Sequence, residues 1–408
     1  MSATEIGVGV WLVLVAQLVM NAAAYASTPF LVLHFSETLG FDAVETGTAM
    51  SVLLLSAKVL PALTGPLADG AGRRLMTVAG MLTRALGFAG LVIREDFWWI
   101  LLMVFLIGLG GAMFDPATNG VLALQSPAVR PRVFAVHLQF LNIGVVGGPI
   151  IGAALMSLGP SGPFAGTSAL LFVAALVLGL AARAIPEGEG SSSSLAGGWR
   201  TALGHRPFLR FLAIMTSWWI VFAQLQLSFP LHAVRLAGDE RWASAVFSVN
   251  GIVGIAFAFV VKRLYERWQA IDNLRWGFVL LIMAFSLVPV GPGFGWFLGC
   301  VIIYTLAETI ILAGGDLLVA RLAPEGRAST FFGMASLAWA LGGTIGNYAG
   351  AWLSLHGGAV VPWLVYASVA AFGALGLWSY REKAVGPTEA SPAGGGGVVH
   401  PAGDEGVC

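Results

Sequence analysis

Charged residues are scarce in this sequence. Only 10% of its 408 residues are Asp, Glu, Lys or Arg, and 57% are hydrophobic. Soluble globular proteins carry about 25% charged residues, so this chain has too few to cover a surface that faces water. We therefore predict that most of its surface faces lipid. The formal net charge is zero, which leaves no basic patch to indicate nucleic-acid binding.

Cysteine is scarce as well. Cys300 lies in an apolar stretch and Cys408 at the C-terminus, so the two form neither a disulfide framework nor a metal-ligand spacing. No nucleophile and base stand at a catalytic spacing, and the predicted loops are too short for a separate domain. An enzyme or a receptor is therefore the least favoured class, and no cofactor or metal is predicted.

Long apolar runs fill the sequence instead. Each is about long enough to cross the ~30 Å hydrocarbon layer of a bilayer as a helix. We predict an all-α integral membrane protein with twelve transmembrane helices, roughly at 8–34, 44–66, 75–93, 97–122, 133–157, 165–184, 208–232, 242–264, 275–290, 294–320, 329–354 and 359–379.

A polar, Gly- and Ser-rich stretch divides these spans into two groups of six. A shift of 197 residues places Pro127 on Pro324 and Arg130 on Arg327, so the halves are predicted to be pseudo-symmetric repeats. Two parallel six-helix repeats are the layout of secondary transporters, with the site between them near the midplane. The predicted divisions are an N-terminal half (1–184), a flexible cytoplasmic linker (185–207), a C-terminal half (208–380) and a disordered tail (381–408).

Lysine and arginine are distributed unevenly between the two sides. If the N-terminus is cytoplasmic, only Arg94, Arg235 and Arg241 fall on the outside, whereas most others fall on the inside. Cytoplasmic loops carry the excess of Lys and Arg. We therefore predict a multi-pass protein of the cell membrane with both termini in the cytoplasm. We also expect this protein to be a monomer.

The segment GPLADGAGRR concentrates charge between spans 2 and 3. Gly65 and Gly72 would permit a tight turn, and Asp69 could meet the N-terminus of a neighbouring helix, where the dipole favours an anion. Arg73 and Arg74 would hold or release Asp69. The segment is thus predicted to be a latch between the halves; the alternative is a plain turn that follows the charge rule.

The pattern G-x-x-x-D-x-x-G-R-R resembles the signature loop of the major facilitator superfamily. That resemblance implies the twelve-helix major facilitator fold, and we expect the partner of Asp69 at the entry to span 11, near Ser329. The family usually has Arg or Lys after the Asp, whereas this chain has Gly70. Part of the charge pairing in the loop is therefore missing or comes from elsewhere.

Span 5 carries a regular glycine spacing. Gly144, Gly148 and Gly152 recur every four residues, with Pro149 among them, which favours close helix packing. The segment resembles the span-5 motif of proton-coupled antiporters in the superfamily, although ordinary small-residue packing would also produce the ridge. Span 11 repeats the spacing at Gly342, Gly346 and Gly350.

Three further segments, GMLTRALGFAG, GLGGAMFDP and RASTFFGMASLAWALGGTIG, resemble the drug:proton antiporter branch, and within it multidrug exporters of the MdtH type. The resemblance implies export of drugs or metabolites in exchange for protons. The Arg that is often seen early in span 4 of that branch is absent from LLMVFLIGLGG, so the usual proton relay does not carry over.

Five ionisable residues lie within predicted spans, where each needs a partner, water or a function. Lys58, Arg84 and Asp115 share the cytoplasmic half of the first repeat, so we predict an Arg84–Asp115 pair inside a gating or proton-carrying cluster. Glu308 lies near the middle of span 10, and Asp316 follows eight residues later. Glu308, Asp115 and Asp316 are the predicted proton-coupling residues.

Glu308 has no cation at its depth in the second half of the sequence. A carboxyl group in a dry cavity can take up and release a proton near neutral pH, or it can bind a cationic substrate. The alternative is a neutral carboxyl held by a hydrogen bond, for instance from Tyr304.

Polar and aromatic residues within the spans are candidates for the walls of a substrate cavity, although each could instead bond to another helix or anchor at the interface. The candidates are Asn21, Tyr25, Gln139, Asn142, Trp218, Gln224, Tyr304 and Asn347. The sequence favours a proton-coupled exporter of hydrophobic small molecules. The main rival is an importer or facilitator of a sugar, organic acid or amino acid, because fold does not fix substrate.

Overall fold

The computed structural model describes residues 6–188, 195–238 and 242–380, and the regular structure within them is helical. The first half contains α1 (Val8–Leu33), α2 (Ala43–Val59), α3 (Pro61–Ala71), α4 (Arg73–Gly90), α5 (Phe97–Ala123), α6 (Arg130–Leu155) and α7 (Gly162–Leu180). The second contains α9 (Arg206–Phe222), α10 (Ser228–Ala237), α11 (Ala243–Arg267), α12 (Ala270–Leu287), α13 (Phe294–Leu322), α14 (Ala328–His356) and α15 (Val361–Ser379).

The twelve predicted spans each correspond to one helix or to one broken helix. Nine helical segments within the described residues are long and apolar enough to cross a membrane, and α2 with α3, bent by 44°, makes ten. The bend falls where Pro61 removes a backbone donor from the helix. The other two spans are α4, which starts with two arginines and contains Arg84, and α11, which ends in a charged run.

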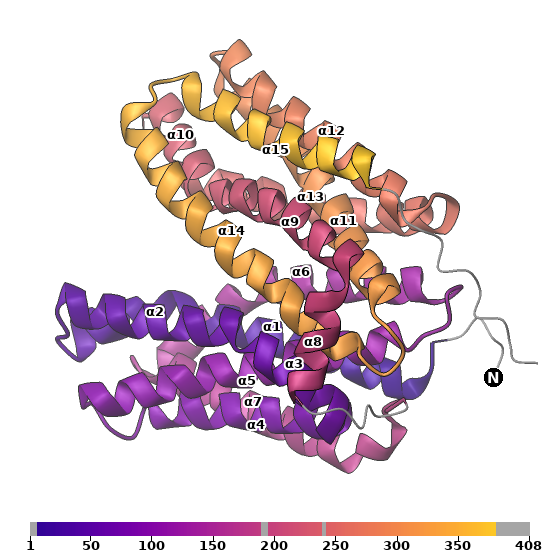
Figure 1. The fold of residues 1–408 in the computed structure, drawn as a ribbon. Coiled ribbons are helices and arrows are strands. Elements are labelled where there is room, and N and C mark those ends of the chain that lie inside the picture. Colours follow the sequence, from indigo (N-terminus) through magenta and orange to yellow (C-terminus); the bar gives the residue numbers. More distant parts are fainter. Residues whose placement is uncertain (1–5, 189–194, 239–241, 381–408) are drawn as a thin grey trace, which may run out of the picture.

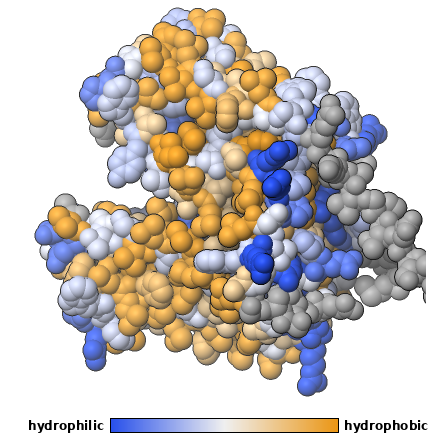
Figure 2. Space-filling model, in the orientation of Figure 1, coloured by the Kyte–Doolittle hydropathy of each residue, from blue (hydrophilic) through white to orange (hydrophobic). Residues whose placement is uncertain are grey.

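The two halves form a V. Figure 1 shows α1–α7 in the lower arm and α9–α15 in the upper arm, with the arms meeting at the right, where α14 crosses onto α3. Figure 2 shows the notch between the arms at the left, and hydrophobic residues over the middle of both arms. We call the meeting side the closed end and the other the open end. The closed end carries the residues that the charge distribution places in the cytoplasm.

The segment between the halves is more ordered than its composition suggested. Residues 195–204 form helix α8 (Leu195–Gly204), so the prediction of a flexible linker is wrong there. Trp199 Nε1 donates to the carbonyl of Ala62 (2.7 Å), and Arg327 Nη1 donates to the carbonyl of Gly197 (2.7 Å). These contacts tie α8 to both halves. Residues 189–194 of the predicted linker and the predicted disordered tail, 381–408, lie outside the described residues.

The predicted glycine ridge of α6 packs against α1. A Cβ atom on Gly144 would meet Asn21 and Ala22, and one on Gly148 would meet Tyr25 and Ala22. In the second half the ridge of α14, starting at Gly342, packs in the same way on α9. Close packing by small residues therefore occurs at matching places in the two halves. Pro149 lies inside α6, which continues to Leu155.

Candidate functional site

The signature segment is a helix end followed by a one-residue turn. Helix α3 runs through Asp69 to Ala71, and Gly72 turns the chain into α4 with φ of +108°, a conformation that favours glycine. The prediction for Gly72 is confirmed, whereas that for Gly65 is wrong. Gly65 lies within α3, where a Cβ would clash with the carbonyl oxygen of Ser329, so its small size serves close packing between the halves.

Asp69 caps the start of α14 from the opposite half. Its Oδ1 accepts from the backbone N–H of Ser329 (3.1 Å), and its Oδ2 accepts from the N–H (2.7 Å) and hydroxyl (2.7 Å) of Thr330. The side chain is only 2% exposed. A carboxylate at a helix N-terminus satisfies free N–H groups and interacts with the helix dipole. The contact lies where the sequence placed it, while its action as a latch stays a prediction.

The two arginines of the segment have different partners. Arg73 Nη2 pairs with Asp69 (2.7 Å), and its Nε donates to the hydroxyl of Ser329 (3.0 Å). Arg74 does not hold Asp69, contrary to prediction. It pairs with Glu187 (2.9 Å) and donates to the carbonyl of Ile185 (2.6 Å). Glu187, in the chain after α7, therefore supplies charge pairing to this loop from elsewhere in the sequence. The basic residue that the family pattern would have at position 70 is absent, because this chain has Gly70.

The closed end also depends on two glycines that face each other. A Cβ on Gly333 would clash with the backbone of Pro61, as one on Gly65 would with Ser329. The backbones of α3 and α14 therefore approach too closely for any side chain at these two points. Sequence reasoning missed Gly333, because nothing near it in the chain marks it as a contact.

We expect Gly333→Ala to shift the protein away from the closed arrangement. The added methyl group would meet backbone, which cannot move aside as a flexible side chain can. A matched control is Gly343→Ala on the same helix, where the nearest atom to the new Cβ is a ring carbon of Trp339 at 3.8 Å. Spin labels at exposed Arg132 and Glu325 report the separation of the halves at this end. Equal distance distributions for the two variants would contradict the expectation.

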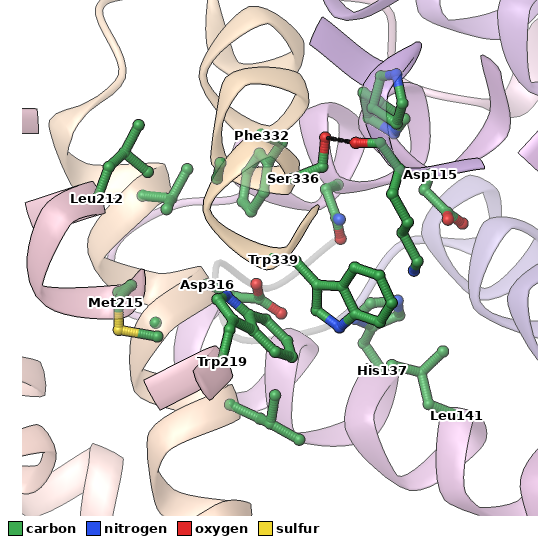
Figure 3. Close-up of a pocket in the computed structure, with 18 of the residues that line it drawn as sticks. Asp115, His137, Leu141, Leu212, Met215, Trp219, Asp316, Phe332, Ser336 and Trp339 are labelled. Carbon is green, nitrogen blue, oxygen red and sulfur yellow. Dashed lines mark hydrogen bonds between the residues drawn. The ribbon is translucent and has the colours of Figure 1, made fainter. Parts of the chain in front are cut away.

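A cavity of about 320 Å³ lies between the halves, with walls from both. Figure 3 shows Trp219, Trp339 and Asp316 from the second half around the same space as Asp115 and His137 from the first. Its polar and indole-bearing residues are Gln17, Asn21, Lys58, Asp115, Asn119, His137, Trp219, Asp316, Ser336 and Trp339. This mixture of carboxylates, amides and indole rings suits a small organic molecule with a polar or charged group.

The predicted charge cluster is present but is not a direct pair. Lys58 and Arg84 both act electrostatically on Asp115, and Gln17 is a hydrogen-bonding neighbour of its carboxylate. Among the side chains that the structure describes, however, no ion pair within 4.0 Å includes Asp115, so the predicted Arg84–Asp115 pair is wrong. The ammonium of Lys58 lies instead over the ring of Trp339, 4.3 Å from its centroid.

Glu308 faces a second, smaller cavity of about 40 Å³, which is enough for a water molecule. Asn250 on α11 donates to Glu308 Oε2 and also to the hydroxyl of Thr305 (3.1 Å). Asn142 on α6, from the other half, lines the same cavity. Glu308 therefore lies at the junction of the halves, and Asn250 rather than Tyr304 is its hydrogen-bond partner.

Several predicted cavity residues take other places. Trp218 and Tyr304 are fully buried and stack on each other, with ring centroids 6.3 Å apart. Gln224 is also buried, and donates to the carbonyls of Ile220 (3.0 Å) and Gly346 (2.9 Å). The prediction that these three residues line the substrate cavity is therefore wrong, because all three side chains are packed between helices of the second half.

Of the other five residues predicted to line a cavity, two line one of the cavities described above and three do not. Asn21 lines the larger cavity and also donates to the carbonyl of Leu141 (2.8 Å), and Asn142 lines the smaller one. Tyr25, Gln139 and Asn347 line neither of these two cavities. For these three residues the role of cavity wall stays a prediction, and Tyr25 lies within electrostatic reach of Arg84 and Glu308.

A family model described as Major Facilitator Superfamily matches residues 13–346 of the chain. The chain belongs to the major facilitator superfamily. The resemblance drawn from the signature segment is thereby confirmed, and the fold of two six-helix halves is that of this superfamily. The finer resemblance of the glycine ridge to proton-coupled antiporters stays a prediction.

Relatives in the superfamily extend over most of the chain. Multidrug resistance protein MdtH of Cronobacter sakazakii is 27% identical over 390 residues, covering 93% of this chain and 96% of that protein. The MFS-type transporter Rv0849 of Mycobacterium tuberculosis is 29% identical over 351 residues, covering 82% of this chain and 83% of that protein. The resemblance to the MdtH type is confirmed at this modest level of identity.

Solved structures of the superfamily have the same fold. A bacterial homologue of the iron transporter ferroportin, crystallised in an outward-facing state, matches with a TM-score of 0.75 at 16% identity, covering 91% of this chain and 98% of that one. At this identity the likeness concerns the fold alone. As a member of the major facilitator superfamily, the chain is a membrane transporter.

Proposed function

We propose that this transporter exports hydrophobic small molecules, such as drugs or metabolites, in exchange for protons. The multidrug resistance proteins among its relatives support export of drug-like molecules. The mixed polar and aromatic cavity between the halves supports a small organic substrate. We further propose that the closed end is cytoplasmic, as the distribution of Lys and Arg indicates, so that the structure is open to the outside.

The observation that carries proton coupling is the position of Glu308. It is an acid inside a membrane-spanning helix, next to a cavity with walls from both halves. When the halves rock, the surroundings of such a carboxyl change, so its proton can be taken up from one side and released to the other. Ionisable residues within spans mark proton paths of this kind.

Asp115 and Asp316 were predicted as further proton carriers. Both line the larger cavity together with Lys58 and the two tryptophans. We therefore assign them to the substrate cavity and Glu308 to the proton. Two separate cavities, one for each partner of the exchange, suit a transporter in which neither partner moves without the other.

The proton gradient is sufficient for export. Each proton that enters contributes ~1.4 kcal/mol per pH unit and ~2.3 kcal/mol per 100 mV. One or two protons therefore sustain substrate gradients of tens- to thousands-fold, at ~1.4 kcal/mol per factor of ten. With a neutral substrate both terms act, whereas exchange of one proton for one monovalent cation moves no net charge and leaves only the pH term.

Everted membrane vesicles test the proposal. We expect an acidic interior to stimulate uptake of hydrophobic compounds from a substrate panel, and dissipation of the pH gradient to abolish that stimulation. Vesicles from cells without the protein provide the baseline. Uptake of a sugar, organic acid or amino acid with no response to the hydrophobic compounds would show that the rival importer or facilitator is correct.

A further inference from the structure

Lys58 makes an unusual contact between the two halves. Its ammonium covers the face of Trp339, 4.3 Å from the ring centroid, and its backbone carbonyl accepts a hydrogen bond from the hydroxyl of Ser336 (3.0 Å), the dashed line in Figure 3. Lys58 belongs to α2, whereas Ser336 and Trp339 belong to α14. The face of an indole ring is a favourable site for a cation, and here a side chain of the protein occupies it.

Trp339 is part of a larger aromatic wall. Trp219 on α9 lies against it, with ring centroids 6.0 Å apart at 65°. Both rings line the larger cavity, and in Figure 3 Asp316 faces the same space. Two indole rings beside a carboxylate are the elements that recognise a flat or bulky organic cation.

The charges around the cavity leave one acid without a partner. Lys58 and Arg84 both act on Asp115. No cation lies within 4.0 Å of Asp316 among the side chains that the structure describes. A charge within the span of a membrane protein needs a partner or a function. Asp316 therefore has no cation of its own, whereas the Lys58 ammonium lies on the face of Trp339.

We propose that the larger cavity is a binding site for a lipophilic monovalent organic cation, and that Lys58 is a tethered competitor for it. The inference rests on the proposed function for the direction of transport only. The substrate pairs with Asp316 and stacks on Trp219, and it displaces the Lys58 ammonium from the face of Trp339. Lys58 then turns towards Asp115, which stays neutralised.

Displacement of Lys58 also affects the conformation. The Lys58–Trp339 contact joins α2 to α14 and exists only while these helices are close. A ligand that removes it favours opening of the closed end by the strength of that contact. Lys58 thereby couples occupancy of the cavity to the separation of the halves, and it selects for cations that compete well with an ammonium.

Equilibrium binding to the purified full-length protein tests the proposal. The probe is radiolabelled 1-methyl-4-phenylpyridinium, and 4-biphenylcarboxylate is the anion of similar shape. We expect Lys58→Met to bind the cation about 3- to 30-fold more tightly than the wild type, the range that a cation–π contact spans. Lys58→Arg, which keeps a competing cation, should bind like the wild type, and Asp316→Asn should bind about tenfold or more weakly. The anion should not bind.

Trp339→Leu provides a second measurement of the same competition. Trp339→Leu removes the ring that both cations use, so it should weaken cation binding by less in the wild type, where Lys58 already covers the ring, than in the Lys58→Met background. Folded Lys58→Met protein that binds the cation no more tightly than the wild type would overturn the proposal. Equal losses from Trp339→Leu in the two backgrounds would do the same, as would equal binding of the anion.

Binding at equilibrium needs no proton gradient, so failure of the two proposals is distinguishable. Tight cation binding without pH-stimulated uptake in vesicles would contradict proton-coupled export and still support the cation site. The reverse result is pH-stimulated uptake of neutral compounds by a protein that does not bind the cation, either as wild type or as Lys58→Met. That result would overturn the cation site and support proton-coupled export.

Discussion

Glu308→Gln is expected to abolish transport that is driven by a pH gradient, while the protein still folds and binds substrate. Glutamine has nearly the same shape as glutamate and can still accept the hydrogen bond from Asn250, but it cannot carry a proton. In acid-interior everted vesicles the variant should show no stimulation of uptake over vesicles without a gradient. Exchange of labelled for unlabelled substrate needs no net proton movement and should continue.

Asp316→Asn is the matched control for Glu308→Gln. Both acids belong to α13, but Asp316 lines the larger cavity and Glu308 the smaller. We expect Asp316→Asn to weaken substrate binding while uptake at saturating substrate still responds to the pH gradient. Wild-type stimulation in the Glu308→Gln variant would refute the coupling role of Glu308. Loss of the response in the Asp316→Asn variant alone would move that role to Asp316.

Asp69→Asn is expected to bias the transporter towards opening at the end that is closed in this structure, and to slow turnover. Asp69 accepts three hydrogen bonds from Ser329 and Thr330 and pairs with Arg73. Asparagine removes the charge and turns one acceptor oxygen into a donor that faces other donors. A contact made in only one state shifts the equilibrium by its energy, plausibly ~1–3 kcal/mol, which corresponds to about 5- to 150-fold.

The shift is measured by the distance between spin labels at Arg132 and Glu325, with Cys300 and Cys408 replaced by serine. Substrate affinity should change little, because the lining of the larger cavity does not include Asp69. Arg74→Gln is the control, since Arg74 belongs to the same segment but contacts Glu187 and Ile185, in the chain that follows α7, and not α14. If both variants keep the wild-type distances and transport rate, the segment is only a turn that obeys the charge rule.

The sequence alone was sufficient for the transmembrane architecture. A span is a local property, since about twenty apolar residues are needed to cross the bilayer wherever they stand in the chain. The contact of Asp69 with Ser329 could also be anticipated, because a helix N-terminus offers free N–H groups whose chemistry does not depend on the rest of the fold. The bend at Pro61 has a local cause too, although the spacing alone suggested a single straight span there.

The cavities could not be predicted in the same way. Asn250 and Glu308 are 58 residues apart, and Lys58 and Ser336 are 278 apart. No spacing in the chain marks such pairs, and one chemically reasonable pairing, Arg84 with Asp115, is not formed. The same limit applies to Gly333, whose small size matters only because Pro61 of the other half lies against it.

Trp218 and Trp219 show most directly why the sequence does not reveal which side chains line a cavity. They are neighbours on α9, yet Trp218 is buried inside the second half and Trp219 lines the larger cavity. In water a helix shows its inner face by a stripe of apolar residues. In a membrane the lipid is as apolar as the core, so both faces carry similar side chains and the pattern no longer reveals which one turns inward. The sequence therefore determined that these helices span the membrane and which ends meet, whereas only the packing of the helices against one another decided which side chains form the cavities.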